Sequence, residues 1–281
     1  MAGKQVTELD ALPSFTDNSL LPVHNGAGLK KGLLSQLANY LGNKFSNPNL
    51  LINPDFKINQ RGATSYEKQG YSVDRWKIWN VTVTPSANGG ITVKNDKYTD
   101  TGTFIQILEN ATEGDSTLSC YVTSVSGTVT MVADDDSQVI LKQGLNIVHT
   151  SKSTKNFIIF LNRGTNVTLK WVKLEQSKVA TEFIAPNPAE ELTKCYRFKY
   201  IGKAVLRGRC TANQAFGFTK DLPTKLRTKP TTTFKSKDSY NVNTVDVTLA
   251  EENNAVYLAG TAENTNQTVI DVVLDLDAEI Y

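Results

Sequence analysis

The sequence predicts a mostly β protein: a short N-terminal segment with one helix, a jelly-roll-like β-sandwich, a short linking helix and a C-terminal β-sandwich. Two observations predict this fold class. Thr, Asn and Val are abundant and Met is rare, which favours strands over helices. From residue 47 onward, short runs that alternate apolar and polar residues are separated by turn formers such as Asn88-Gly89-Gly90. The length of 281 residues is enough for about two domains and a further segment.

Residues 1–46 differ in composition from the rest and are predicted to be a docking segment. The run LLSQLANYL predicts one short amphipathic helix, and Asn25-Gly26 predicts a hairpin turn, since NGAGLKKG lacks the glycine spacing of a phosphate-binding loop. So few apolar groups cannot form a core alone, because ordering each residue costs about 1–2 kcal/mol of backbone entropy. We therefore expect the segment to bind a partner surface through its apolar side chains: Leu20, Leu21, Val23, Leu34, Leu37 and Leu41.

Residues 47–186 are predicted to form the first β-sandwich. Runs such as TFIQILEN, TVTMVAD and KNFIIFLN have the length and alternation of single strands. In NVTLKWVKLE the same alternation predicts that Val167, Leu169, Trp171 and Lys173 share one face of a strand.

Aromatic residues are concentrated between positions 66 and 79: Tyr66, Tyr71, Trp76 and Trp79. Trp76 and Trp79 are three residues apart, so they point to opposite faces of a strand. We predict that Trp76 lies in the core, with Asp74 and Arg75 forming hydrogen bonds at its rim, and that Trp79 or Tyr71 faces solvent. An exposed aromatic ring can bury the C–H face of a sugar, which makes Tyr71 and Trp79 candidate glycan-binding residues.

Residues 187–281 are predicted to form a second β-sandwich that begins with a short helix. Asn187 can cap this helix, Pro188 suits its first position, and Glu190 follows three residues after the cap. Pro186 and Pro188 mark a hinge between the two β-domains. The run NQTVIDVVLDLDAEIY predicts a strand with one apolar core face: Ile270, Val272, Leu274, Leu276, Ala278 and Ile280.

The sequence lacks the usual signatures of a reactive centre. His24 and His149 have no triad context, and the motifs G-x-S-x-G and H-E-x-x-H are absent, which argues against Ser-His-Asp and zinc hydrolysis. Cys120, Cys195 and Cys210 lack the spacing of a metal site or a disulfide framework, and we predict that they are reduced core thiols. We expect neither a metal nor a cofactor.

Two carboxylate clusters could in principle serve a glycosidase, since sequence does not give the distance between acids. Asp134–Asp136 is typical of a solvated turn, with loose Ca²⁺ binding as the alternative. Asp275, Asp277 and Glu279 share one strand face, where a solvent-facing row or an interface paired with Lys or Arg is favoured over a catalytic site.

Charge and hydropathy exclude two classes of partner. Lys plus Arg number 30 and Asp plus Glu number 28, and the resulting net charge of +2 provides no field for a nucleic-acid backbone. The N-terminus has no apolar signal region, and no window approaches the about 18 apolar residues that a membrane-spanning helix needs. We expect no nucleic-acid partner, no membrane insertion and folding in a cytoplasm.

Three stretches, NLLINPDFKINQRG, YSVDRWKIW and KLEQSKVATEFIAPNPAEELTKCYRFKY, resemble the body of tailed-bacteriophage fibre and other virion appendage proteins. The segment KLRTKPTTTF resembles a strand start in the same family, and TELDALPSFTDNSLLPVHNGAGLKKGLLSQLANYL is similar to adaptor segments that attach fibres to a virion. The resemblance covers nearly the whole chain. It implies a strand beginning at NLLIN, a homotrimer, docking on other virion proteins through residues 1–46, and location in a virion assembled in the host cytoplasm.

The function expected from the resemblance is that of a non-enzymatic structural fibre protein. Its N-terminus would anchor it, and its β-domains would project for adhesion to host-surface glycan or for contacts within the virion. The alternative is a virion-associated polysaccharide depolymerase or glycan esterase, and a third possibility is a stand-alone carbohydrate-binding module. The motifs do not distinguish a tail fibre from a head or collar fibre, and they identify neither host nor glycan.

Overall fold

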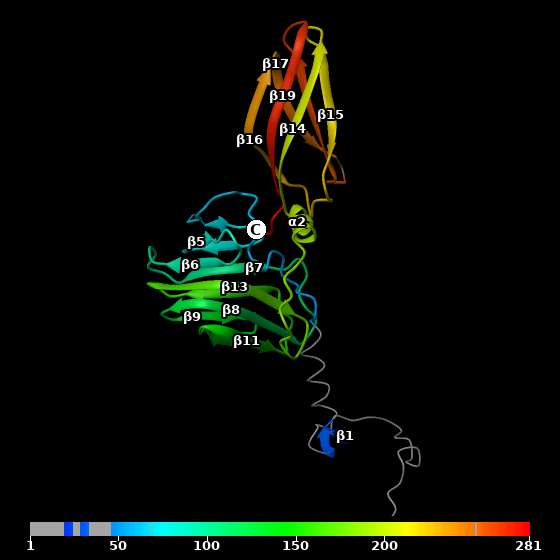
Figure 1. Ribbon diagram of the computed structural model, residues 1–281. Helices are drawn as coiled ribbons and strands as arrows, with labels where there is room; N and C mark the ends of the chain where they lie inside the picture. Colours follow the sequence, from blue (N-terminus) through cyan, green and yellow to red (C-terminus); the bar gives the residue numbers. More distant parts are fainter. Residues whose placement is uncertain (1–19, 25–28, 34–45, 68, 251) are drawn as a thin grey trace, which may run out of the picture. The chain divides into compact units, whose positions relative to one another are not determined.

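The computed structural model of the chain describes residues 20–24, 29–33, 46–67, 69–250 and 252–281 (Figure 1). The protein is mostly β, with several antiparallel sheets and, in the described residues, one helix, which confirms the predicted fold class. It divides into two compact units: residues 1–47 with 179–184, and residues 48–178 with 185–281. Two hydrophobic cores, one within residues 51–174 and one within residues 200–278, lie in the second unit.

In the first unit, β1 (Leu20–His24) pairs with β2 (Leu29–Leu33) as an antiparallel hairpin. The pairing confirms the hairpin that Asn25-Gly26 predicted. Leu20 is exposed. The other predicted docking residues, and the predicted helix over 33–41, lie wholly or by their side chains outside the described residues: Leu21, Val23, Leu34, Leu37 and Leu41.

The sandwich consists of a six-stranded and a five-stranded antiparallel sheet (Figure 1). The first has the order β10-β9-β12-β7-β4-β3 and contains β3 (Gly70–Tyr71), β4 (Lys77–Trp79), β7 (Gly102–Ile107), β9 (Val129–Val132), β10 (Gln138–Ile140) and β12 (Asn156–Leu161). The second has the order β11-β8-β13-β6-β5 and contains β5 (Thr82–Pro85), β6 (Ile91–Asn95), β8 (Ser116–Ser126), β11 (Gly144–Thr150) and β13 (Thr165–Glu175). Between β6 and β13 the chain crosses to the other sheet at nearly every step, which is the connectivity of a jelly roll.

Trp76 lies at the centre of the sandwich core, as the sequence predicted. Its side chain is 0% exposed and stacks on Phe104, with ring centroids 4.6 Å apart and planes 7° apart. Phe56 and Phe157 meet the same indole at 5.2 and 5.9 Å. The indole Nε1 donates a hydrogen bond to the Asn53 carbonyl at 3.0 Å, so the polar atom of this buried ring is satisfied.

The expected strand at NLLIN is not formed. Asn53 and Phe56 have φ angles of 57° and 60°, in the left-handed region, and residues 51–56 make bends and turns instead. Side chains replace the missing strand ladder. Asn53 donates from Nδ2 to the carbonyls of Ile58 (2.8 Å) and Asp74 (3.1 Å), and its backbone N–H donates to Glu191 at 2.6 Å. No strand forms here because the Asn53 side chain satisfies backbone groups at Ile58 and Asp74, and Glu191 satisfies the N–H of Asn53 itself.

The face predicted for β13 is correct only as far as Leu169. The pairing of β13 with β8 shifts register on both sides of this residue, which marks a β-bulge. The bulge inverts the alternation: Leu169 and Val172 are both fully buried, whereas Trp171 is half-buried and lies opposite Tyr121 on the outer side. Trp171 therefore does not share the core face with Leu169.

The C-terminal module begins with α2 (Pro188–Tyr196), where the Ala189 N–H donates to Asn187 Oδ1 at 2.9 Å and confirms the predicted cap. Two three-stranded antiparallel sheets follow. One has the order β14-β19-β16, from β14 (Lys199–Cys210), β16 (Thr231–Tyr240) and β19 (Asn266–Asp277); the other has the order β15-β18-β17, from β15 (Ala215–Asp221), β17 (Val242–Leu249) and β18 (Ala255–Ala262). The predicted core face of the last strand is confirmed, since its residues are buried from Ile270 to Ala278 and Ile280 is half-buried.

The acidic face of β19 and of the residues that follow it is paired with cations, as the second of the two favoured interpretations predicted. Lys199 Nζ bonds to Asp275 and, at 3.0 Å, to Asp277. Arg75 Nη1 donates to Glu279 Oε2 at 2.5 Å, with side chains 2% and 0% exposed. The Arg75–Glu279 pair therefore joins the C-terminal module to the sandwich, whereas the pairs of Lys199 lie within the module.

Replacing the central indole should unfold the sandwich far more readily than replacing the nearby exposed one. We expect Trp76→Ala to lower the free energy of unfolding by about 3–5 kcal/mol, because it empties a closely packed site. The matched control is Trp79→Ala, which removes a half-exposed ring and should cost about 1 kcal/mol or less. Urea unfolding followed by circular dichroism measures both. Equal midpoints for the two variants would contradict the core assignment of Trp76.

Asp74 should make the protein more stable in mild acid than at neutral pH. Burial raises the pKa of its carboxyl to about 6, although Gln60 donates two hydrogen bonds to it. Because this pKa is higher in the folded than in the unfolded state, the stabilisation is complete below the unfolded value and is lost as pH rises through 6. Between pH 5 and 7, the free energy of unfolding should fall by about 1 kcal/mol more in the wild type than in Asp74→Asn. Parallel pH profiles from chemical denaturation would contradict this.

Candidate functional site

Trp79 is the half-exposed aromatic residue at the end of β4. The neighbouring Ile78 is buried against the core, so the alternation of the strand turns Lys77 and Trp79 to the outer face of the six-stranded sheet. The side chain of Trp79 is 49% exposed. We predicted that Trp79 or Tyr71 faces solvent, and for Trp79 this is confirmed.

The outer face extends across five strands, and the strand registers show which residues lie next to one another on it. Trp79 lies opposite Thr103, Thr103 opposite Phe160, Phe160 opposite Thr130, and Thr130 opposite Ile140. A second row runs beside it, from Lys77 through Ile105, Ile158 and Val132 to Gln138. We call these two rows together the Trp79 face. Neighbouring strands are about 4.8 Å apart, so Trp79 and Phe160 lie about 10 Å apart with a Thr hydroxyl between them.

Tyr71 lies at the edge of the Trp79 face and is more constrained than Trp79. It pairs with Lys77 across β3 and β4, which puts it on the same side of the sheet. Its hydroxyl donates to the Ile280 carbonyl, and its ring meets the edge of Tyr281 at 5.5 Å. Burial, followed by the negative charge of Glu279, raises the pKa of Tyr71 to about 12, so the hydroxyl stays a proton donor. The glycan-binding role of Tyr71 stays a prediction. Part of its ring is already in contact with Tyr281.

Phe160 and Ile140 belong to the Trp79 face and Tyr281 lies beside it, but none of the three was singled out from the sequence. Ile140 and Tyr281 are 57% and 77% exposed, and Lys77 Nζ lies 5.9 Å from the centre of the Tyr281 ring. The sequence did indicate on which face of its strand Phe160 lies, because in KNFIIFLN it alternates with Ile159 and Leu161, which are buried. The sequence could not show which residues lie beside Phe160, since its neighbours depend on pairing between strands that are far apart in sequence.

The Trp79 face can bind the flat side of a sugar ring. The indole and Phe160 supply apolar surface for axial C–H groups, while the hydroxyls of Thr103 and Thr130 and the ammonium of Lys77 supply polar contacts at the edges.

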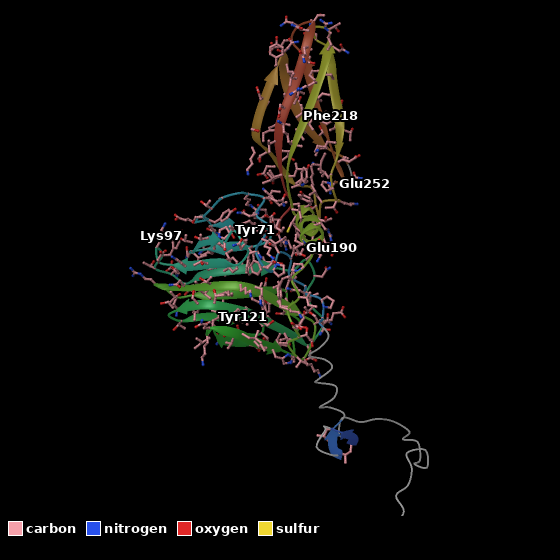
Figure 2. The ribbon with its side chains drawn as sticks, in the orientation of Figure 1. Tyr71, Lys97, Tyr121, Glu190, Phe218 and Glu252 are labelled. Carbon is pink, nitrogen blue, oxygen red and sulfur yellow. The ribbon has the colours of Figure 1, made fainter. Side chains whose placement is uncertain are left out.

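A second aromatic surface lies on the outer side of the five-stranded sheet. Tyr121, labelled in Figure 2, is 39% exposed, and its ring centroid is 6.1 Å from that of Trp171. Leu145 pairs with Tyr121 and is 56% exposed. We call Tyr121, Trp171 and Leu145 the Tyr121 face. The sequence did not predict it, because the bulge at Leu169 places Trp171 on the side opposite to the one its spacing indicates.

The Asp134–Asp136 cluster forms a turn that is held by backbone hydrogen bonds. Asp134 accepts backbone hydrogen bonds from Lys155 at 2.5 Å and from Asn156 at 3.2 Å, and Asp135 accepts one from Ser137 at 3.1 Å, as in the predicted turn. Among the described residues, no group of three or more His, Cys, Asp and Glu side chains could hold a metal ion. In the same part of the chain, no helix is long and apolar enough to cross a membrane.

The predicted state of the cysteines is confirmed. Cys120, Cys195 and Cys210 are all buried and unbridged. Burial raises the pKa of the Cys120 thiol to about 12, and burial together with nearby carboxylates raises that of Cys195 further, so both stay protonated.

Comparisons with known proteins identify no family. No protein-family model matches the chain, and no curated protein matches it. Recombinant discoidin II of Dictyostelium discoideum is similar at 8% identity with a TM-score of 0.21, over 69% of this chain and 84% of that one. A wild-type discoidin II from the same organism gives 10% identity and a TM-score of 0.21, over 69% and 83%. A deletion mutant of Bacillus subtilis oxalate decarboxylase gives 9% and 0.14, over 83% and 82%. Likenesses at these TM-scores carry no functional conclusion.

The exposure of Trp79 predicts a simple spectroscopic result. The chain has 3 Trp. Trp76 is fully buried, Trp171 is half-buried and Trp79 is 49% exposed, so Trp79→Phe should remove most of the tryptophan emission that iodide quenches. Trp76→Phe should leave the quenchable fraction of the remaining emission higher than in the wild type. Stern–Volmer plots for the three proteins measure this, and a Trp79→Phe plot as steep as that of the wild type would contradict the exposed placement.

Proposed function

We propose that the chain is a non-catalytic structural fibre protein of a bacteriophage particle, which is anchored through residues 1–46 and adheres to host-surface glycan through the Trp79 face. The observation that carries the adhesion is the half-exposed Trp79, set in a row with Thr103 and Phe160 on a flat outer sheet. The phage assignment is supported by the resemblance of NLLINPDFKINQRG, YSVDRWKIW and KLEQSKVATEFIAPNPAEELTKCYRFKY to virion appendage proteins.

A flat aromatic surface suits weak adhesion. On an open sheet face a sugar ring loses water from only one side, so a single site is expected to bind weakly. A fibre with three copies of the chain, on a particle with many fibres, would raise the effective concentration enough for millimolar sites to hold a cell. The proposed homotrimer is therefore part of the adhesion.

The N-terminal segment supports attachment to a larger particle. Leu20 in β1 is 56% exposed, which leaves apolar surface available for a partner. A chain that acted alone in solution would have little use for such a segment. The proposal therefore places residues 1–46 against other virion proteins, with Leu21, Val23, Leu34, Leu37 and Leu41 as further docking residues.

Glycan binding should depend on Trp79 and not on the opposite sheet. On an array of host-surface glycans, Trp79→Ala should weaken binding about tenfold, because tenfold corresponds to about 1.4 kcal/mol and an aromatic contact contributes about 0.5–1.5 kcal/mol beyond the area that it buries. Tyr121→Ala is the matched control, since it removes a similarly exposed aromatic residue from the other face, and it should bind as the wild type does. Equal loss in both variants, or no glycan signal from the wild type, would contradict adhesion through the Trp79 face.

Two further measurements test the structural part of the proposal. Light scattering should give the mass of a trimer, and a chain without residues 1–46 should fail to join particles assembled in its presence. Incubation with host surface polysaccharide should release no new reducing ends or free acyl groups. Release of either at a steady rate would favour the depolymerase or esterase alternative over a passive fibre.

A further inference from the structure

Two arginines, Arg207 and Arg209, lie on the outer face of the β14-β19-β16 sheet, near the C-terminal end of β14. The registers place Arg209 opposite Gln267, Arg207 opposite Val269, and Val269 opposite Tyr240. Leu206, which alternates with the two arginines, pairs with the fully buried Ile270, so Arg207 and Arg209 point away from the core. Both arginines are exposed, and Tyr240 is 59% exposed. This arrangement lies in a different module from the Trp79 face.

The charges of these two arginines are not neutralised within the described part of the chain. Four other arginines are engaged there, by a carboxylate or by backbone carbonyls: Arg61, Arg75, Arg197 and Arg227. The guanidinium groups of Arg207 and Arg209 form no ion pair or hydrogen bond among the described residues, although the two residues are two positions apart on one strand face, about 7 Å from each other. Two guanidinium groups at this spacing repel each other until an anion bridges them.

The surroundings of the pair have the shape of a shallow binding site. A hollow of about 430 Å³ is lined by Arg207, Gly208, Arg209, Asn266 and Gln267. Beside Arg207, Val269 forms an apolar floor, and Tyr240 stands about 10 Å away, two strand spacings across the sheet. The amides of Asn266 and Gln267 add donors and acceptors at the rim of the hollow.

Three acids lie near the arginine pair. Glu263 is exposed and lines a neighbouring hollow with Tyr240 and Asn266, and the other two acids lie in the next row of the sheet. Asp271 is opposite Val205 and is paired with Lys203 at 2.9 Å, and Asp238 is opposite Asp271. Since each row is separated from the next by two residues along the strand, these acids limit the positive surface to the end that holds Arg207 and Arg209.

We propose that Arg207 and Arg209 bind the carboxylate of an acidic saccharide, whose ring lies on Val269 and reaches Tyr240. A planar guanidinium matches a carboxylate through two parallel N–H···O bonds, and the pair offers two such groups to neighbouring uronate units. The aromatic and aliphatic side chains cover the C–H face of the ring. The site does not depend on the Trp79 face, so either can fail while the other stands.

The test uses the full-length protein and polygalacturonate, with fully methyl-esterified polygalacturonate as the neutral probe. Calorimetry should show binding of the acidic polymer only, and the affinity should fall as salt is raised. The double variant Arg207→Gln/Arg209→Gln should bind at least about tenfold more weakly, since it loses two charge-assisted contacts. Arg207→Lys keeps the charge but loses the fork, and should bind several-fold more weakly than the wild type.

The controls separate this site from general attraction of polyanions. Arg163 is also exposed and forms no ion pair in the described chain, and it lies in the turn between β12 and β13, so Arg163→Gln should bind polygalacturonate as the wild type does. Trp79→Ala should also retain this binding. A double variant that melts at the wild-type temperature yet binds normally would overturn the proposal. So would equal binding of the methyl ester, equal loss in Arg163→Gln, or equal affinity for duplex DNA.

Discussion

The ion pair between Arg75 and Glu279 is the interaction on which the arrangement of the second unit depends. Both side chains are almost completely removed from solvent, so each charge is stable only when the other is in place. Arg75 also donates to the Ile107 carbonyl at 2.7 Å, and its guanidinium lies 3.7 Å from the centre of the Phe198 ring. Because Arg75 is adjacent to Trp76 in sequence, the centre of the sandwich and the end of the chain are held through neighbouring residues.

The placement of the surface aromatic residues follows from this junction. Glu279 brings Ile280 and Tyr281 to the edge of β3, where the Ile280 carbonyl accepts the Tyr71 hydroxyl. Tyr71 is thereby fixed, whereas Trp79 on the next strand has no such partner among the described residues. Tyr71 and Trp79 were equal candidates for glycan binding in the sequence. In the structure they differ in how much of each ring remains available to a ligand.

Local patterns in the sequence predicted the elements, and the structure confirms those that depend on nearest neighbours. The cap at Asn187 requires only three consecutive positions, and the core face of the last strand requires only its own alternation. The failures are of another kind. A bulge at Leu169 and an Asn53 that replaces a strand ladder both depend on partners more than twenty residues away. The two rows of the Trp79 face could not be predicted either, because they exist only in the register between strands.

The three shielded thiols have a practical consequence. The chain has 3 Cys, and all are enclosed in the interior, so none should react with a maleimide while the protein is folded. A single cysteine introduced at the exposed Gln138 would carry a dye or a gold cluster without competing labels. A dye at Gln138, which lies in the second row of the Trp79 face, would report whether a ligand binds to that face.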